Sequence, residues 1–266
     1  MKFKNYGGLP DQFTKFENSK VVIIPVPYDG TSTWIKGADK GPEALIEASC
    51  NMEVYDIGAD NEVYKIGIHT AEPIRERRSP ERVAKEVEAK VTQTLKKKKF
   101  PVVLGGEHSV SIGAFKAFAD FYKDSDFTIL QFDAHADMRQ EYEGSKYNHA
   151  CVMARASEWA PILQVGIRSM SYEERADIKP DRVFYADYIL DSKNNTWMYD
   201  LLNKVGKNVY ITIDLDVLDP SIMSSTGTPE PGGMLWYQLI DILDKVNQKS
   251  NIVGFDVVEL CPMKYN

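Results

Sequence analysis

Short, almost continuous apolar runs are the feature that most limits how this chain can fold. The clearest, "KVVIIPV" (20–26), is apolar at successive positions rather than at alternate ones. Strands of this kind are buried on both faces, as in a parallel sheet covered by helices on either side. We expect strands at residues 20–26, 101–104, 127–132, 161–167, 182–185, 208–213 and 251–258, and a less regular eighth strand at 52–58.

The stretches between these runs carry helical signals. The clearest helix begins with Ser79 as an N-cap and Pro80 in its first turn. Its apolar stripe consists of Val83, Val87, Val91 and Leu95, and other helices are expected at 42–50, 110–122, 196–204 and 236–247. Strands that alternate with helices predict an α/β fold in three layers. Because no repeat, low-complexity segment or linker interrupts the pattern, we expect one domain over residues 1–266.

Composition excludes several classes of protein. The net charge of −7 disfavours nucleic-acid binding. The three cysteines, Cys50, Cys151 and Cys261, show no CxxC spacing, which favours a reducing compartment over a disulfide framework or a zinc ribbon. The N-terminal segment has no apolar core, and no apolar run reaches the ~18 residues of a membrane span. We therefore expect a soluble cytoplasmic protein that acts without membrane or nucleic acid.

Three potential metal ligands follow one of the expected strands. The stretch "FDAHAD" (132–137) places Asp133, His135 and Asp137 two residues apart, directly after the run that ends near Phe132. Side chains at this spacing face the same way if the chain stays extended. Ligands of open parallel sheets bind at the carboxyl ends of the strands. The spacing predicts that these three side chains converge.

Two further strand ends add to this set. "ITIDLDVLDP" supplies Asp214 and Asp216, and "VVLGGEHS" supplies His108 after a glycine turn. Carboxylates packed together raise one another's pKa unless cations lie between them. Two divalent ions that share carboxylates resolve this, and the oxygen-rich donor set favours manganese over zinc. Such a pair of ions makes hydroxide from water at neutral pH, which predicts a hydrolase.

Other residues narrow the choice of the bond that is cleaved. Glu259 ends the last expected strand and suits a planar guanidinium, which a carboxylate holds through two hydrogen bonds. A phosphate substrate would instead need Arg139 or Arg168 at the mouth, so a dinuclear phosphoesterase remains an alternative. His149, beyond a polar loop, is either a proton shuttle or a structural histidine. The turn-rich loop 225–233 either shapes the pocket or only reverses the chain.

These motifs together resemble a known family. "GGEHS", "DAHAD", "IDLDVLDP" with "TGTPEPGG", and "GFDVVE" are similar to the signature set of the ureohydrolases, which include arginase and agmatinase. The stretch from "VPYDGTST" to "GPEALIEAS" resembles the family's N-terminal strand, loop and helix. The resemblance extends over nearly the whole chain in the family's motif order. It implies a three-layer α/β/α fold with an eight-stranded, mainly parallel sheet and two Mn²⁺ ions.

The resemblance also implies roles for single residues. One ion would be held by His108, Asp133, Asp137 and Asp214, and the other by Asp133, His135, Asp214 and Asp216. A hydroxide that bridges the ions would attack the guanidinium carbon. Asp137 would pass a proton to the leaving amine, Glu259 would grip the guanidinium and His149 would shuttle protons. Thr228, in the loop 225–233, would contact the substrate, and relatives form trimers or paired trimers, which implies a homo-oligomer.

The chain departs from the family in two places. Members usually continue past the strand of the glutamate into a covering helix, whereas this sequence ends at Asn266. Either the sequence given is shorter than the full protein, or the last strand is covered in another way, for instance by a subunit. The chain also has Trp34 and Lys36 where relatives often have Arg and Pro, which puts the pocket entrance in question.

The loop after Asp137 bears on the substrate. It lacks the polar Asn/Ser pattern of arginases and offers Glu141 and Glu143, which would repel a carboxylate tail unless they are only solvated loop charges. We therefore expect a small cationic guanidine, agmatine, which gives putrescine and urea. An aminopropyl derivative suits the same rim. Guanidinobutyrate, arginine or formimidoylglutamate would need a basic rim from Arg139, Lys146 or Lys36. A non-catalytic paralogue would show a lost ligand, and all six are present.

Overall fold

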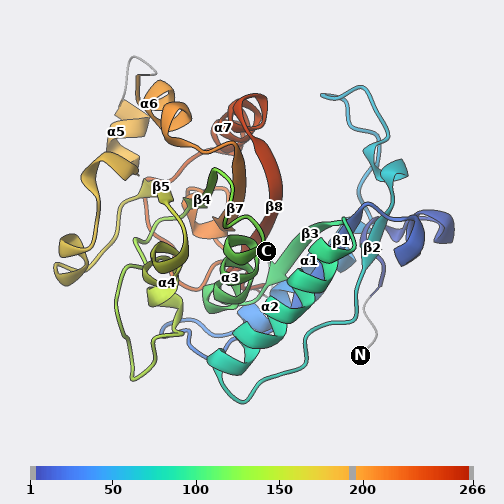
Figure 1. Ribbon diagram of the computed structural model, residues 1–266, viewed down its shortest axis with the longest axis horizontal. Helices are drawn as coiled ribbons and strands as arrows, with labels where there is room; N and C mark the ends of the chain where they lie inside the picture. Colours follow the sequence, from blue (N-terminus) through green and yellow to red (C-terminus); the bar gives the residue numbers. More distant parts are fainter. Residues whose placement is uncertain (1–3, 192–195, 264–266) are drawn as a thin grey trace.

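A computed structural model describes residues 4–191 and 196–263 of the chain. Its centre is an eight-stranded sheet with the order β2-β1-β3-β8-β7-β4-β5-β6, in which all neighbouring strands are parallel (Figure 1). The strands are β1 (Val21–Val26), β2 (Ile68–Thr70), β3 (Phe100–Gly105), β4 (Phe127–Phe132), β5 (Ile162–Ile167), β6 (Val183–Tyr185), β7 (Asn208–Asp214) and β8 (Asn251–Val258). The predicted parallel α/β architecture is confirmed, with seven strands at the expected places.

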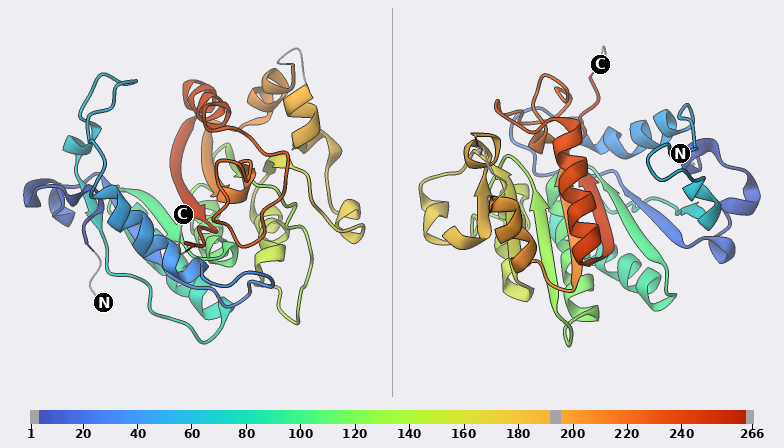
Figure 2. Two further views of the ribbon diagram at one scale, coloured as in Figure 1. Left: turned by 180° about the vertical axis from the view of Figure 1, so that it is seen from behind. Right: turned by 90° about the horizontal axis from the view of Figure 1, so that it is seen from above.

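Helices cover both faces of the sheet (Figure 2). They are α1 (Gly41–Ser49), α2 (Pro80–Lys96), α3 (Ser111–Phe121), α4 (Val152–Trp159), α5 (Ala186–Asp191), α6 (Thr196–Lys204) and α7 (Trp236–Lys249). The side chains of α2, α3 and α4 share one hydrophobic cluster with one face of the sheet, and those of α1, α5, α6 and α7 pack on the other. The longest helix starts as predicted, because the Ser79 side chain accepts a hydrogen bond from the Arg82 backbone. Within the described residues, no helix has the length and hydropathy needed to cross a bilayer.

The eighth strand is not where the sequence suggested. The prediction of a strand at 52–58 is wrong: this segment forms turns, with one antiparallel bridge between Asp56 and Asn61, and it exposes Tyr55 and Ile57. The eighth strand is β2, three residues at the edge of the sheet that pair with β1. A strand of three residues is too short to show a periodic pattern of apolar residues. Only its pairing with β1 identifies it as a strand. The apolar residues of 52–58 have no sheet to pack on.

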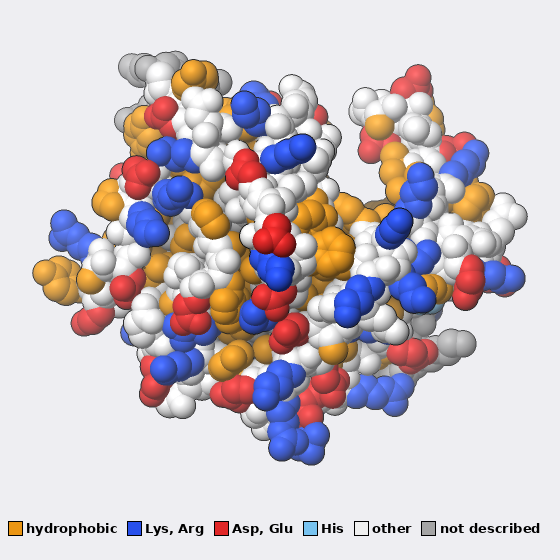
Figure 3. Space-filling view, in the orientation of Figure 1, with side chains coloured by type: hydrophobic (Ala, Val, Ile, Leu, Met, Phe, Trp, Pro, Cys, Tyr) orange, Lys and Arg blue, Asp and Glu red, His pale blue; other side chains and the backbone are white. Residues whose placement is uncertain are grey.

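The core on the α1 side of the sheet has two parts. One cluster lies under α5, α6 and α7, and a smaller one lies under α1. Between them is an apolar cavity of about 530 Å³, lined in part by Phe255 and Val257 of β8 and by Trp236 of α7. Figure 3 shows hydrophobic side chains gathered in the notch between the α7–β8 part and the N-terminal part of the molecule. Among the described residues, β8 is thus fully covered only on the face that lies toward α3. Its other face borders the cavity.

The strand order determines where the site lies. The strands β3, β8, β7 and β4 are neighbours in the sheet, although β8 comes last in the sequence. Because all four are parallel, their carboxyl ends meet at one edge. His108, Glu259, Asp214 and Asp133 stand at these four ends.

Candidate metal centre

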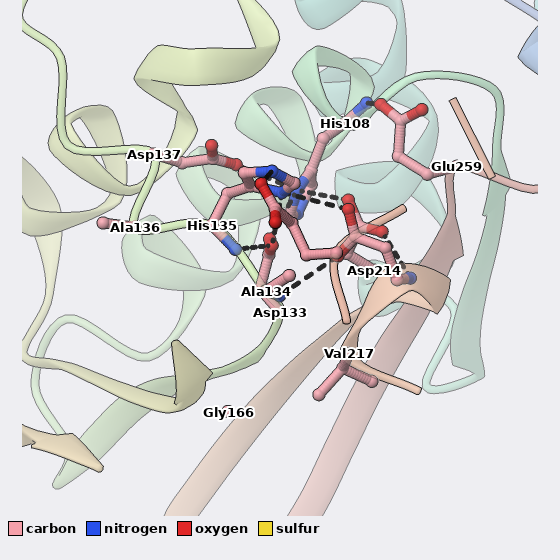
Figure 4. A network of polar contacts seen from close by, with 12 residues as sticks. His108, Asp133, Ala134, His135, Ala136, Asp137, Gly166, Asp214, Val217 and Glu259 are labelled. Atoms are coloured by element: carbon pink, nitrogen blue, oxygen red, sulfur yellow. Dashed lines mark hydrogen bonds and ion pairs between the residues drawn. The ribbon is translucent and has the colours of Figure 1, made fainter. Parts of the chain in front are cut away.

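The first group of potential ligands surrounds His108. Its Nδ1 atom lies 3.2 Å from Oδ2 of Asp133, 3.2 Å from Oδ2 of Asp137 and 3.5 Å from Oδ2 of Asp214. All four side chains are buried. Figure 4 shows His108, Asp133 and Asp214 pointing toward one another from separate segments of the chain. His108, Asp133 and Asp214 each place one donor atom within 4.8 Å of the others, close enough to share one ion.

Hydrogen bonds behind His108 fix its tautomer. The Thr212 hydroxyl donates to Oδ1 of Asp256 at 2.6 Å and lies 2.9 Å from Nε2 of His108. Tyr210 donates to the other oxygen of Asp256 at 2.8 Å. Because the Thr212 proton goes to Asp256, the threonine oxygen accepts from His108, and the ring proton is on Nε2. The lone pair of Nδ1 therefore faces the three carboxylates.

This arrangement needs a positive charge between the groups. A buried lone pair that faces carboxylate oxygens is repelled by them, and within the described part of the chain Nδ1 of His108 has no hydrogen-bond partner. Burial alone would lower the pKa of His108, but its contacts with Asp133, Asp137 and Asp214 raise that pKa well above the usual value. The same demand for positive charge is met by a divalent cation. The donor set of one imidazole and buried carboxylates fits a hard metal ion.

A second group lies beside the first and shares Asp133. Nδ1 of His135 is 3.0 Å from Oδ2 of Asp216 and 3.6 Å from Oδ1 of Asp133. These three residues also place ligand atoms within 4.8 Å of one another. Oδ2 of Asp216 is buried and has no hydrogen-bond partner among the described residues, which fits an atom that ligates a metal ion. Two adjacent groups with one common carboxylate fit a pair of ions.

The backbone orients the aspartates. Oδ1 of Asp214 accepts from the Asp216 backbone at 2.9 Å, and Oδ1 of Asp216 accepts from the Ala134 backbone at 3.0 Å. Each of these carboxylates therefore keeps its Oδ2 for the site. Asp133 is held by the His135 backbone at 2.6 Å and by the Gln131 amide at 2.7 Å. These hydrogen bonds fix the orientation of the ligand groups.

The convergence does not come from extended backbone, as the spacing had suggested. Strand β4 ends at Phe132, and Asp137 adopts a left-handed conformation with φ of 54°. Glu259, after β8, is likewise left-handed with φ of 64°. Such backbone costs about 1–3 kcal/mol in a non-glycine residue and persists only where surrounding contacts hold it. Here the Asp137 carbonyl accepts from Met153 and Ala154, at 3.0 and 3.2 Å.

Close approach of two strand ends requires glycine at one position. A Cβ at Gly106 would lie 2.0 Å from the carbonyl oxygen of Tyr28. The Gly106 backbone donates to Val26 at 2.9 Å, and its carbonyl accepts from Glu259 at 2.8 Å. The glycine turn of "GGEHS" thus lets β1, β3 and β8 meet closely behind the site.

Glu259 is fixed beside the ligands. Its Oε1 accepts from the His108 backbone at 2.8 Å, and the side chain is buried. Burial, followed by the neighbouring Glu107, raises the pKa of Glu259 well above its usual value. A carboxylate in this position is stabilised by a cationic group that binds next to it.

These groups open into a cavity of about 330 Å³. Its inner wall contains His108, His135, Asp137, Asp214, Glu259, His149 and Thr228, which are all sequence-predicted site residues. The lining also includes Glu174, which is buried, and the more exposed Arg139, Tyr142 and Met170, which we call the mouth. Asp133 and Asp216 lie behind this wall and contact His108 and His135.

Several residues considered from the sequence lie elsewhere. Glu141 and Glu143 are exposed and do not line the cavity, so their role in substrate binding stays a prediction without a contact to support it. Trp34 is 76% exposed, and Lys36 pairs with Asp29 at 3.4 Å outside the lining. Among the described residues, the Arg168 guanidinium donates only to backbone carbonyls, those of Gly166, Asp216, Val217, Glu230 and Pro231.

Sequence reasoning missed the residues behind the ligands. Tyr210, Thr212 and Asp214 alternate along β7, and Thr212 stands opposite Asp256 in the register with β8. A charged residue inside the apolar run "NIVGFDVV" was the available signal, because a buried aspartate needs a partner. Glu174 gave no such signal, since it lies in a polar loop.

Comparison with known proteins agrees with this geometry. The sequence pattern of the arginase family matches residues 19–266. The chain is 35% identical to the N(1)-aminopropylagmatine ureohydrolase of Synechocystis sp. (96% of this chain, 85% of the relative). It is 38% identical to an enzyme of the same name from Thermus thermophilus (94% and 85%).

A solved structure gives the same result. The agmatine ureohydrolase of Thermoplasma volcanium superposes with a TM-score of 0.87 at 31% identity, over all of this chain and 89% of the other. The family pattern, the relatives and the two groups of buried ligands coincide. The chain therefore belongs to the arginase family and is a metal-dependent ureohydrolase.

Proposed function

We propose that this ureohydrolase cleaves the guanidinium group of agmatine to give putrescine and urea. The observation that carries the proposal is the position of Glu259, buried in the cavity wall next to both ligand groups. A carboxylate there pairs with a guanidinium and holds its carbon beside the metal centre.

Two divalent ions would be held by His108, Asp133, Asp137, Asp214, His135 and Asp216. We propose manganese, because the hard oxygen donors of this set favour a hard metal ion. When bound, they supply a water-derived nucleophile at neutral pH. Asp133 belongs to both groups, which supports its predicted bridging position, and Asp214 beside His108 is the second bridge that we propose.

The residues of the chain bind the substrate and move the proton. Glu259 keeps Oε2 for the guanidinium, because Oε1 accepts from the His108 backbone. Asp137 lines the cavity, with its Oδ2 3.2 Å from Nδ1 of His108. Its carboxylate is thus placed to take a proton at the metal centre and pass it to the leaving amine. His149 in the cavity wall would return that proton to the site.

The charges at the mouth support a cationic tail. Glu174 is buried and accepts from the Met138 backbone at 2.9 Å and the Ser171 backbone at 2.7 Å. Arg139 lies over the Tyr142 ring at 4.6 Å, with its Nε 3.9 Å from Glu174, so its charge is largely offset. With the charge of Arg139 offset, the described lining offers no unpaired cation to a carboxylate tail, which favours a substrate with an ammonium tail.

A second substrate is supported by the relatives and by the mouth itself. Two proteins at 35% and 38% identity are named for N(1)-aminopropylagmatine. At the mouth, Met170 is 41% exposed, so a longer tail meets an apolar side chain there. We propose N(1)-aminopropylagmatine as the alternative substrate, which would release urea and the corresponding triamine.

A phosphoesterase is disfavoured by the same structure. The Arg168 guanidinium is bonded to backbone carbonyls, and Arg139 has Glu174 beside it. Among the described residues of the lining, no other arginine or lysine is available to grip a phosphate.

The test is urea release by metal-stripped protein that is reloaded with Mn²⁺ or Zn²⁺. Agmatine, N(1)-aminopropylagmatine, arginine and guanidinobutyrate are compared by kcat/KM. We expect manganese-dependent turnover of the two cationic substrates, with their ratio deciding between them. Preference for arginine or guanidinobutyrate would overturn the assignment of the tail. The predicted trimer or hexamer is measured on the same protein by sedimentation.

A further inference from the structure

Two glutamines interrupt the apolar strands behind the metal centre. Gln131 lies in β4 and Gln164 in β5, and they stand opposite each other in the register of the sheet. Both side chains are buried. A buried amide costs free energy unless its donors and its acceptor find partners. The partners of these two amides therefore indicate their role.

The direction of every hydrogen bond in this pair is determined by its partners. Nε2 of Gln164 donates to the Ala136 carbonyl and to Oε1 of Gln131, at 2.7 Å each. A carbonyl can only accept, so the amide nitrogen of Gln164 must face Ala136. The amide nitrogen of Gln131 faces the metal centre, where it donates to Oδ2 of Asp133 at 2.7 Å and to the His135 carbonyl at 3.3 Å. Turning either amide over would place oxygen against oxygen.

The two backbone carbonyls that accept belong to residues 133–137, which carry three of the ligands. Strand β4 ends just before this segment. Gln131 reaches the carbonyl of His135, and Gln164 reaches that of Ala136. The side-chain amides thus fix the backbone of the segment as well as the carboxylate at its start. These bonds help to explain why the ligands converge although the segment is not extended.

The carboxylate that Gln131 holds is the one that both ligand groups share. Its Oδ2 accepts from Gln131 and lies 3.2 Å from Nδ1 of His108. Its Oδ1 accepts from the His135 backbone at 2.6 Å and lies 3.6 Å from Nδ1 of the His135 ring. Each oxygen of Asp133 is thus held by an N–H donor and faces one ligand group. Because a rotation of the carboxylate moves both oxygens, loss of one donor affects both groups.

We propose that Gln131, anchored by Gln164, is a positioning residue that sets the orientation of the Asp133 carboxylate toward both metal sites. Among the described residues, Gln164 donates to no ligand side chain, so its influence passes through Gln131 and one backbone carbonyl. Loss of this support weakens the binding of both ions. The inference rests on the two-ion centre of the proposed function and is independent of the guanidine that is cleaved.

Binding of Mn²⁺ to metal-stripped protein tests the proposal without turnover. Titrations followed by the EPR signal of free Mn²⁺ compare the wild type with Gln131→Met, Gln164→Met and the double variant. Methionine keeps about the size of the side chain and removes its donors. We expect both ions to bind about 10–100-fold more weakly in Gln131→Met. Gln164→Met should show a smaller loss, about five-fold.

The double variant separates positioning from packing. Because Gln164 acts largely through Gln131, the double variant should lose less affinity than the product of the two single losses. The control is Thr128→Val, which removes a buried hydrogen bond to Gly206 at the other end of β4 and should leave both affinities within about two-fold. Losses that multiply, a loss at one ion only, or an equal loss in Thr128→Val would overturn the proposal.

Circular dichroism of the metal-free variants checks that each one folds. If Gln131→Met does not fold, Gln164→Met alone decides, and wild-type affinity in that variant overturns the proposal.

Kinetics separates this role from substrate binding. At a Mn²⁺ concentration that saturates the wild type, Gln131→Met should lower kcat about ten-fold or more and leave KM for agmatine within about two-fold, because neither glutamine lines the cavity. A raised KM with unchanged kcat would contradict the proposal. Absence of urea from every guanidine in the wild type would instead reject the proposed function and leave the Mn²⁺ titrations standing.

Discussion

Thr212 decides what His108 can bind, although it touches no substrate. It accepts from Nε2 of His108 and donates to Asp256, which leaves Nδ1 as the only free nitrogen of a completely buried ring. The affinity of the metal centre therefore depends on a hydroxyl group behind it. Partners of this kind commonly change metal affinity by about 10–100-fold.

Thr212→Val removes that hydroxyl and keeps the shape of the side chain. We expect the ion beside His108 to bind about 10–100-fold more weakly, because the ring loses its fixed tautomer. Titration of metal-stripped protein with Mn²⁺ measures the change. Thr212→Ser, which keeps the hydroxyl, is the control, and equal affinities of the Val and Ser variants would contradict the expectation.

Glu259→Gln tests substrate binding separately from metal binding. The amide oxygen can still accept from the His108 backbone, so the fold and metal content should persist. Loss of a buried charge pair with the guanidinium should cost about 2 kcal/mol or more, which is at least about a 30-fold loss in kcat/KM for agmatine. Metal analysis beside the kinetics separates the two effects, and an unchanged kcat/KM would reject the role of Glu259.

At this scale the ligands were predictable and their supports were not. Asp133, His135 and Asp137 stand out in the sequence because charged residues at a strand end have few structural uses. Thr212 and Asp256 act through contacts between distant segments, and a single sequence does not show such contacts. The left-handed backbone of Asp137 likewise depends on Met153 and Ala154, beyond the next loop.

Among the elements, the loop 219–234 is held by hydrogen bonds with Asp219 and Arg168. Asp219 accepts from Ser221 at 3.0 Å and from Gly232 and Gly233 at 3.1 Å each, which closes the loop at its base. Arg168 holds the loop from outside through the Glu230 and Pro231 carbonyls, at 2.8 and 3.0 Å. The loop presents Thr228 to the cavity, so its rigidity bears on the substrate.

Arg168→Met should loosen this loop and the end of β7. Five backbone carbonyls lose a charged donor, and we expect a loss of about 2–4 kcal/mol in the free energy of unfolding together with a raised KM. Urea denaturation and steady-state kinetics measure both. Arg175→Met, at an exposed position, is the control. Equal stability of the two variants would show that the carbonyl contacts do not hold the loop.

Asp219 also predicts a dependence on pH. Hydrogen bonds from Ser221, Gly233 and Gly232 lower the pKa of Asp219 to about 2 in the folded protein, from 3.8. Its contribution to stability is therefore complete above about pH 4 and is lost as the pH falls through the folded-state pKa. The Tm difference between wild type and Asp219→Asn should be constant from pH 7 to about 4 and shrink below that. A difference that grows on acidification would contradict the assignment.

Elements were predictable where they are long or deeply buried. The helix 80–96 has an N-cap, a proline and an apolar stripe, and each of these signals agrees with its tertiary place. The strand β2 and the helices α4 and α5 were missed because each is at most eight residues long, which is too short for a clear periodic pattern. Their structure is determined by packing on the sheet. Segment 52–58 was mistaken for a strand because its composition is apolar, although its backbone turns at Gly58 and Asp60.

At the scale of the whole molecule, the buried carboxylates make the thermal stability of the folded protein depend on bound metal ions. Asp133, Asp137 and Asp214 lie together without solvent, and burial raises the pKa of Asp214 well above its usual value. Removal of bound ions should lower Tm by about 5–10 °C, since a ligand at 100 times its Kd contributes about 2.7 kcal/mol. Calorimetry before and after chelation measures the shift. Asp133→Asn, which lacks the shared ligand, should show a much smaller shift, and an equal shift would place the ions elsewhere.

The place of β8 in the sheet has a consequence for the order of events during synthesis. Strands β2, β1 and β3 form one contiguous block, and β7, β4, β5 and β6 form another, while β8 is the strand that joins them. Both blocks must therefore emerge from the ribosome before residues 251–258 have been synthesised. Until then, the inner edge strand of each block lacks its partner strand. The pairings of β8 with β3 span about 150 residues, which makes this closure slow. His108 follows β3 in one block, whereas Asp133 and Asp214 stand at the ends of strands of the other, so the ligand group around His108 is completed only when β8 is in place.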